Sequence, residues 1–182
     1  DQPDVVQLFL NDYAEGKSQS IVETKVQETI MIAAEFGATN TIKRFIDMGF
    51  SSDFTMLDTS PIEVAEKANA FDAFNLLLNS SKNNSVYILK FEASNSILLI
   101  GSKVIDASKR NADSEILANY QKLKTFDQKE KIAVKLFELG LYNSLGLLLK
   151  NDKSLKVILK NPSLKEKIEI EFFKALHLSL IH

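Results

Sequence analysis

Cysteine is absent from the 182 residues, and histidine occurs only as His177 and His182. Without cysteine the chain has no disulfide, thiolate zinc site or cysteine nucleophile. Two histidines leave little for a histidine metal cluster or a Ser-His-Asp triad. No charge dominates either, with 22 Lys and Arg against 24 Asp and Glu, so the basic excess typical of nucleic acid binding is missing. We expect no catalytic centre, metal or cofactor in this segment, and neither a nucleic acid nor a small-molecule substrate.

Long apolar runs are missing as well. The longest nearly uncharged apolar stretch, residues 94–102, falls well short of the roughly 18 residues that cross a bilayer. We therefore expect this stretch to be buried and a membrane partner to be absent. The chain starts at Asp1 without the basic and apolar regions of a signal peptide, and we expect it to be cut from a longer protein.

Glycine and proline are scarce, with six and three residues respectively, so helices can run with few interruptions. Apolar residues recur at the i, i+3, i+4 spacing that aligns side chains on one helical face. The clearest of these stripes are Val6/Phe9/Leu10, Ile42/Phe45/Ile46, Phe74/Leu77/Leu78 and Leu145/Leu148/Leu149. Short turns separate them, which predicts an all-α fold of antiparallel helix pairs.

One helix pair is repeated along the chain. Residues 33–37, followed by Ile42 and Phe45, match residues 65–69, Phe74 and Leu77 at a constant offset of 32 positions. The agreement covers apolar, small and turn residues at a single shift, which chance rarely produces. The sequence therefore predicts an internal repeat.

The repeat resembles the ankyrin family, which has a period of about 33 residues and the signature T-P-L-H-x-A. Residues 60–65, Ser-Pro-Ile-Glu-Val-Ala, are similar to that signature, with Glu63 in place of the histidine. Gly37 and Asn69 fall where the inner helix ends, and both residue types tolerate the left-handed conformation that ends a helix. The match is best over residues 28–81.

The resemblance implies an ankyrin-like helical repeat stack that continues into diverged helical hairpins. Its first part, residues 1–81, holds the ankyrin-like repeats, the first of them truncated. Its second part, residues 82–182, is a diverged helical repeat or C-terminal helical region packed on the first as one unit. The spacing of residues 136–149 equals that of 33–46 and predicts a helical hairpin there.

Residues 85–110 allow two interpretations, because short apolar runs cannot be assigned by period alone. They form either two buried helices or a β-hairpin that turns at 93–95, and we favour helices, since a lone hairpin in a helical stack must find its own apolar cover. Downstream, residues 113–125, 127–139 and 162–181 are expected to be amphipathic helices.

Two kinds of charged residue could carry chemistry. The carboxylate pairs Glu63/Glu66, Glu166/Glu169 and Asp106/Asp113 could serve acid–base catalysis, but without accompanying groups they are more typical of solvated helix faces. A basic run could bind phosphates or acidic lipids, although acidic residues interrupt it and no aromatic residue lies within it. This run consists of Lys150, Lys153, Lys156, Lys160, Lys165 and Lys167.

The segment 50–58, here called the finger, is the strongest candidate for a binding site. In the ankyrin family the fingertips and the inner-helix surface bind proteins, and the resemblance implies the same role here. Phe54 is either an exposed anchor or a buried cover, and we expect Leu57 to be buried. The expected partner-binding residues are Asp53, Phe54, Met56, Asp58, Glu63, Glu66 and Lys67.

The function expected from these features is that of a protein–protein interaction scaffold, the non-catalytic region of a larger protein. The Lys/Asn/Ser/Ile-rich composition and degenerate repeats resemble ankyrin-containing effectors that intracellular bacterial pathogens deliver into host cells. That resemblance implies secretion into the host cell and a host protein as partner. The alternatives are a membrane- or phosphate-binding module that uses the basic run, and part of an enzyme whose catalytic residues lie mostly outside this segment.

Overall fold

The computed structural model describes residue 11 and residues 16–160, with side chains up to residue 157. Within these residues the fold is all-α, as the sequence predicts, and the β-type pairing consists of one isolated bridge between Met56 and Thr59. The elements are α2 (Gln19–Glu35), α3 (Thr39–Asp47), α4 (Pro61–Lys67), α5 (Phe71–Ser80), α6 (Asn84–Ala93), α7 (Ile97–Lys109), α8 (Asp113–Tyr120), α9 (Phe126–Glu138), α10 (Tyr142–Asn151) and the 3₁₀ segment η1 (Lys153–Lys160).

The chain divides into two compact units, Asp1–Leu98 and Leu99–His182, and each is described by itself. The division expected from the sequence, at residues 81 and 82, separates ankyrin-like repeats from diverged repeats and not compact units. It stays a prediction.

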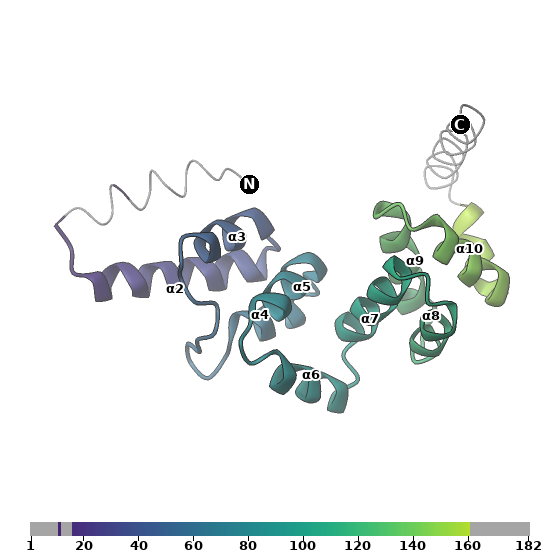
Figure 1. The fold of residues 1–182 in the computed structure, drawn as a ribbon, viewed down its shortest axis with the longest axis horizontal. Coiled ribbons are helices and arrows are strands. Elements are labelled where there is room, and N and C mark those ends of the chain that lie inside the picture. Colours follow the sequence, from purple (N-terminus) through teal and green to yellow (C-terminus); the bar gives the residue numbers. More distant parts are fainter. Residues whose placement is uncertain (1–10, 12–15, 161–182) are drawn as a thin grey trace. The chain divides into compact units, whose positions relative to one another are not determined.

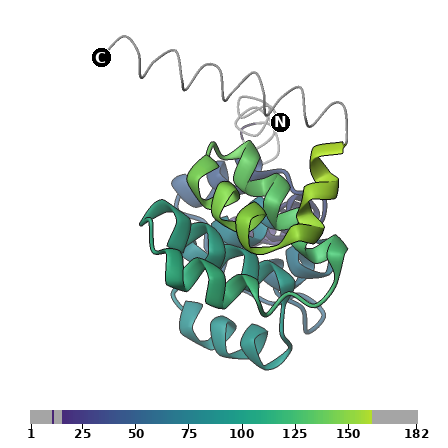
Figure 2. The same ribbon diagram turned by 90° about the vertical axis from the view of Figure 1, so that its right-hand side faces the viewer.

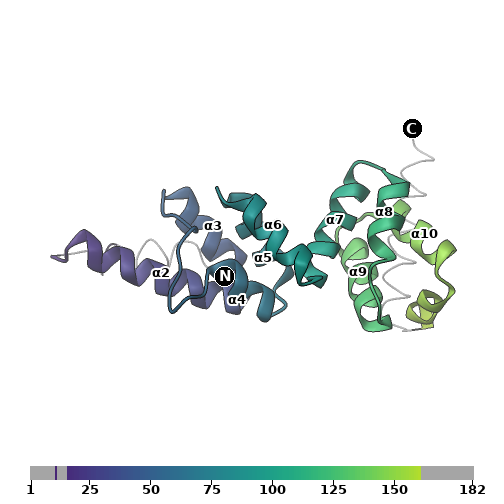
Figure 3. The ribbon, with the colours of Figure 1, turned by 90° about the horizontal axis from the view of Figure 1, so that it is seen from below.

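In the first unit, α2 packs against α4, and α3 packs against α5 (Figures 1 and 3). Helices α2 and α3 also contact each other, as do α4 and α5. The apolar stripes face each other between the helices, which removes them from water. The residues expected in this core are buried, except that Ile46 is half-buried. The buried set is Ala33, Ala34, Ile42, Phe45, Ala65, Phe74, Leu77 and Leu78.

Residues 84–93 and 97–109 are helical, which confirms helices over a hairpin. Of these two helices, α7 is mostly buried as expected, whereas α6 is mostly exposed, with Val86 and Leu89 in solvent. Helices α6 and α7 are joined by a short turn at 94–96. Phe91 of α6 is buried, and its ring meets that of Phe74 in α5 at 5.1 Å between centroids. This contact gives α6 the apolar cover that a hairpin at the same place would have lacked.

A single turn geometry joins successive helices at five places. At each place one residue has positive φ, between 53° and 70°, and it is always glycine or asparagine. Glycine lacks the Cβ that makes this left-handed conformation costly, and asparagine tolerates it better than most residues. The five residues are Gly37, Asn69, Asn95, Asn111 and Gly140.

The same hydrogen bond closes each of these turns. The residue after the left-handed position donates its N–H to the carbonyl five residues earlier, at 2.8–2.9 Å. This is the 6→1 bond of the Schellman motif, which satisfies a carbonyl that the helix end leaves unpaired. The five bonds run from Ala38 to Ala33, Ala70 to Ala65, Ser96 to Phe91, Ala112 to Ala107 and Leu141 to Leu136.

In the second unit, η1 (yellow in Figure 2) lies against α9 and α10, and α8 packs on α10. Asp152, between α10 and η1, accepts hydrogen bonds from Tyr120 Oη at 3.1 Å, from Lys129 Nζ at 2.8 Å and from Ser154. The bond from Lys129 and those from Ser154 and Tyr120 outweigh partial burial and lower the pKa of Asp152. One ionised carboxylate thus connects α8, α9 and η1.

Two expected helix bounds differ from the structure. The helix expected over 113–125 ends at Tyr120, where the N–H groups of Lys122 and Leu123 bond to carbonyls three residues earlier instead of four. The next helix begins at Phe126, after Thr125 and Gln128 exchange cap hydrogen bonds. The expected helix at 162–181 and the stripe Val6/Phe9/Leu10 lie outside the described residues.

Because Asn69 has φ of 56° and its side chain is exposed, its backbone conformation can be tested without disturbing the core. We expect Asn69→Gly to leave the free energy of unfolding equal or slightly higher. Asn69→Val should lower it by about 1–2 kcal/mol, because a β-branched residue is strained at positive φ.

Urea denaturation measures both changes. Asn79→Val, at an exposed position within α5, is the matched control and should cost little, because valine and asparagine have similar helix propensities. Equal destabilisation by the two valine substitutions would show that the left-handed turn is not a constraint.

Candidate functional site

The finger leaves α3, extends as a loop and returns to α4 (Figure 1). Met56 and Thr59 exchange both backbone hydrogen bonds, at 2.9 and 3.0 Å, so Leu57 and Asp58 form a two-residue turn at the tip. Both have positive φ, 50° and 60° respectively. Positive φ at both central positions is characteristic of a type I′ turn, which favours Asn-Gly.

Leu57 is 99% exposed, and the expectation that it is buried is wrong. The physical reason is the tight turn, which projects the two central side chains away from the rest of the finger. A leucine here is unfavourable twice, because its backbone lies in a left-handed conformation and its side chain is fully in water. Strain of this kind is most often kept at functional positions.

Phe54 and Met56 are both half-buried. Phe54 packs against the buried cluster of Val26, Ile30 and Phe45. Of the two roles expected for Phe54, an exposed anchor or a buried cover, the structure therefore supports the buried cover. The apolar residue that the finger presents to solvent is therefore Leu57, and Phe54 holds the base of the finger on the core.

Asp53 ties the finger to the end of α5. Its carboxylate accepts hydrogen bonds from Ser81 Oγ at 2.6 Å and from the Lys82 N–H at 2.8 Å. Charge-assisted bonds of this kind are stronger than neutral ones. The finger is thereby fixed at its base by the apolar contacts of Phe50 and Phe54 and by one carboxylate, while its tip, with Leu57 and Asp58, is exposed.

Glu63 caps α4. Its Oε2 accepts the N–H and the hydroxyl of Ser60, both at 2.8 Å, and its Oε1 accepts a hydrogen bond from Lys90 of α6. Partial burial opposes ionisation of Glu63, but the hydrogen bonds from Lys90 and Ser60 outweigh it and hold its pKa below the ordinary value. Glu63 thus binds the turn through its carboxylate.

Three of the predicted site residues, Glu63, Glu66 and Lys67, line one groove of about 510 Å³ within the first unit. Its other wall comes from the end of α6, with Lys90 and Phe91, and from the turn at 94–96. Phe91 is 4% exposed and forms an apolar floor, while two carboxylates and two ammonium groups surround it. A balanced charged rim over an apolar floor is typical of a protein interface.

The sequence did not single out Lys90, Phe91 or the turn at 94–96 as part of this site. The pattern Ser-x-x-Glu at 60–63 is a capping box and could have shown that Glu63 is held at the start of α4. The pairing of Glu63 with Lys90 joins residues 27 positions apart and has no local sequence signal.

The remaining candidates from the sequence are the carboxylate pairs, the basic run and the two histidines. Asp106 and Asp113 are exposed, and among the described residues no group of three or more Asp, Glu or His side chains could hold a metal ion. In the basic run, Lys150, Lys153 and Lys156 are exposed. The side chain of Lys160 is not described, and Lys165, Lys167, Glu166, Glu169, His177 and His182 lie outside the described residues.

Within the described part of the chain, none of the helices has the length and apolar character needed to span a membrane. Comparisons with protein-family models, curated proteins and solved structures give no match. The geometry of the finger and the groove is therefore what bears on function.

Because the pKa of Glu63 is lowered in the fold, ionised Glu63 stabilises the folded state. This contribution is complete above the pKa of the unfolded chain, about 4.3, and is lost as the pH falls through the lower folded value. Glu63→Gln keeps an acceptor for the cap but loses the ion pair. We expect the wild type to be more stable than Glu63→Gln at neutral pH, with the difference narrowing below about pH 4.

Urea denaturation between about pH 3 and pH 7 measures this difference. Glu66→Gln is the matched control on the same helix, because no hydrogen bond to the Glu66 carboxylate occurs among the described residues. If both variants follow the same pH dependence, the cap and ion pair of Glu63 do not stabilise the fold as inferred.

Proposed function

We propose that this segment recognises a partner protein through the tip of the finger and the groove beside α4. The observation that carries the proposal is Leu57, which is 99% exposed at φ 50°. A leucine at this position lowers solubility and is strained at positive φ, so a functional contact is the best explanation for its presence. Buried by a partner, it would supply an anchor of the kind that dominates binding energy.

The groove supports the same proposal. Glu66 and Lys67 offer one charge of each sign at its edge, and the apolar part of the lining comes from the half-buried Ile97 and the almost fully buried Phe91. A site for phosphates or nucleic acid would instead gather positive charge. Mixed charges around an apolar floor fit the side chains of another protein, and they add specificity more than affinity.

The proposal includes the relation to the ankyrin family. The five equal turns and the α2–α4 and α3–α5 contacts are what a stack of helix pairs requires. In such a stack, fingers and inner helices present a continuous surface to a partner. We also propose that this segment is a non-catalytic binding region of a larger effector protein and that its partner is a host protein.

The test is a Leu57→Asn substitution. Asparagine tolerates the left-handed conformation, so the variant should be about 1 kcal/mol more stable or equal in stability, while a buried leucine anchor is lost. We expect capture of the partner from a cell extract, quantified by mass spectrometry, to fall at least about tenfold. Phe54→Ala is unsuitable as a probe, because Phe54 packs on the core.

Leu89→Asn is the matched control, since Leu89 lies on α6 and is 67% exposed. It makes the same substitution at an exposed leucine away from the finger, although Leu89 is less exposed than Leu57, and it should leave capture unchanged. Undiminished capture of every protein by Leu57→Asn would disprove the role of the fingertip.

A further inference from the structure

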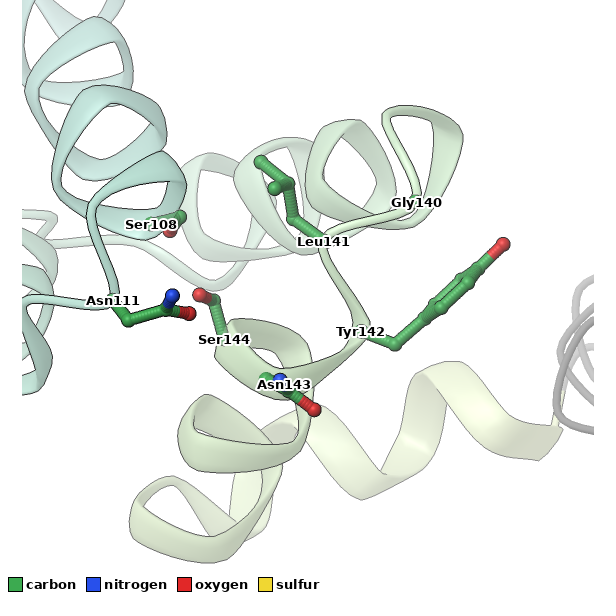
Figure 4. Close-up of a pocket in the computed structure, with 7 residues that line it drawn as sticks. All are labelled: Ser108, Asn111, Gly140, Leu141, Tyr142, Asn143 and Ser144. Carbon is green, nitrogen blue, oxygen red and sulfur yellow. The ribbon is translucent and has the colours of Figure 1, made fainter. Parts of the chain in front are cut away.

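A second pocket, of about 200 Å³, lies within the second unit between two of the equal turns (Figure 4). Ser108 at the end of α7 and Asn111 in the turn after it form one side. Gly140 and Leu141 of the turn between α9 and α10, with the first residues of α10, form the other. None of its lining side chains carries a charge, and the first turn of α10 contains no acidic residue. The pocket is small, polar and uncharged.

The start of α10 offers unused hydrogen-bond donors to this pocket. No side chain caps the helix, and within the described part of the chain no acceptor binds the N–H groups of Asn143 and Ser144. Such free N–H groups, together with the positive end of the helix dipole, favour an anion. A helix end alone is common and does not make a binding site.

The hydroxyl of Ser144 also faces this pocket. Ser144 is 4% exposed, yet among residues 16–160 its Oγ has no hydrogen-bond partner. Figure 4 shows this oxygen pointing into the pocket, toward the side-chain amide of Asn111. The Ser144 side chain is almost fully buried, but its unpaired Oγ is not sealed in the core, so a ligand atom that enters the pocket can reach it.

The hydroxyl of Ser108 is already hydrogen-bonded, unlike that of Ser144. It donates to the Val104 carbonyl at 2.7 Å, so its proton is already used and only its lone pairs are free. Asn111, which lies at φ 53° in the turn, can present its NH₂ group by rotation of its amide. The free donors thus come from α10 and Asn111, and Ser108 adds none.

We propose that this pocket binds an oxyanion of the carboxylate or phosphate kind. Two backbone N–H groups, the Ser144 hydroxyl and the Asn111 amide would supply its hydrogen bonds. Without a lysine or arginine in the lining, the affinity should be millimolar. The site is separate from the finger and the groove, so it does not depend on the function proposed for them.

The experiment is a ¹H–¹⁵N NMR titration of the full chain with inorganic phosphate and, separately, with acetate, at constant ionic strength set by sodium chloride. We expect a saturable shift of the Asn143 and Ser144 amide signals with at least one anion, and the two titrations show which oxyanion is preferred. The start of α8 is the internal control, since Asp113 and Glu115 in its first turn repel anions.

Two variants test the contacts. Ser144→Ala and Asn111→Gly should each weaken binding about tenfold, because each removes a donor to a charged group, and glycine preserves the left-handed turn. Ser108→Ala should leave the affinity equal or slightly higher. The proposal is overturned if neither anion shifts Asn143 and Ser144 saturably, or if Ser144→Ala and Asn111→Gly bind like the wild type.

Discussion

Closing a helix with one left-handed residue is the constraint on which the rest of this structure depends. A helix ends with unpaired carbonyls. Among the described residues the same 6→1 hydrogen bond satisfies one of them at five turns that lead directly into the next helix, and again at Gly49, where α3 ends and the finger begins. The bond forms only where the residue before its donor adopts positive φ, which restricts that position to glycine or asparagine. Within each unit, a buried helix can therefore be followed at once by a second helix that packs back against its neighbours.

The same geometry explains where binding features occur. A turn of this kind starts the second helix without a side-chain cap at Ala38, Ala70, Ala112 and Leu141. At the start of α10, no acceptor among the described residues binds the N–H groups of Asn143 and Ser144. In the first unit, the finger between α3 and α4 is the long connection between such helix pairs. Its base is held by Phe54 and Asp53, so Leu57 is presented at the tip by an anchored loop.

Much of the fold could be predicted from the sequence, because helical periodicity and small-residue turns are local signals. Gly37 and Asn69 were identified as left-handed positions, whereas Asn95 and Asn111 were not. Asn95 and Asn111 each lie two residues before the start of a helix, as Gly37 and Asn69 do. The apolar residues around Asn95, however, fit a strand as well as a helix, so the sequence did not mark a helix end there.

The candidate site was less predictable, because exposure and pairing are not local. Leu57 was expected to be buried on the ground that it is apolar, and only the two positive φ values at the tip explain its exposure. The roles of Asp53 and Glu63 depend on partners 28 and 27 positions away. No spacing rule connects residues so distant.

Amide hydrogen exchange at the turn-closing N–H groups tests most directly whether one turn geometry organises the fold. These groups belong to Ala38, Ala70, Ser96, Ala112 and Leu141. We predict that all five exchange about a hundredfold or more slowly than in an unstructured peptide, while the unbonded amides of Asn143 and Ser144 exchange fast. Unprotected amides at these five positions, with the neighbouring helices protected, would contradict a common turn.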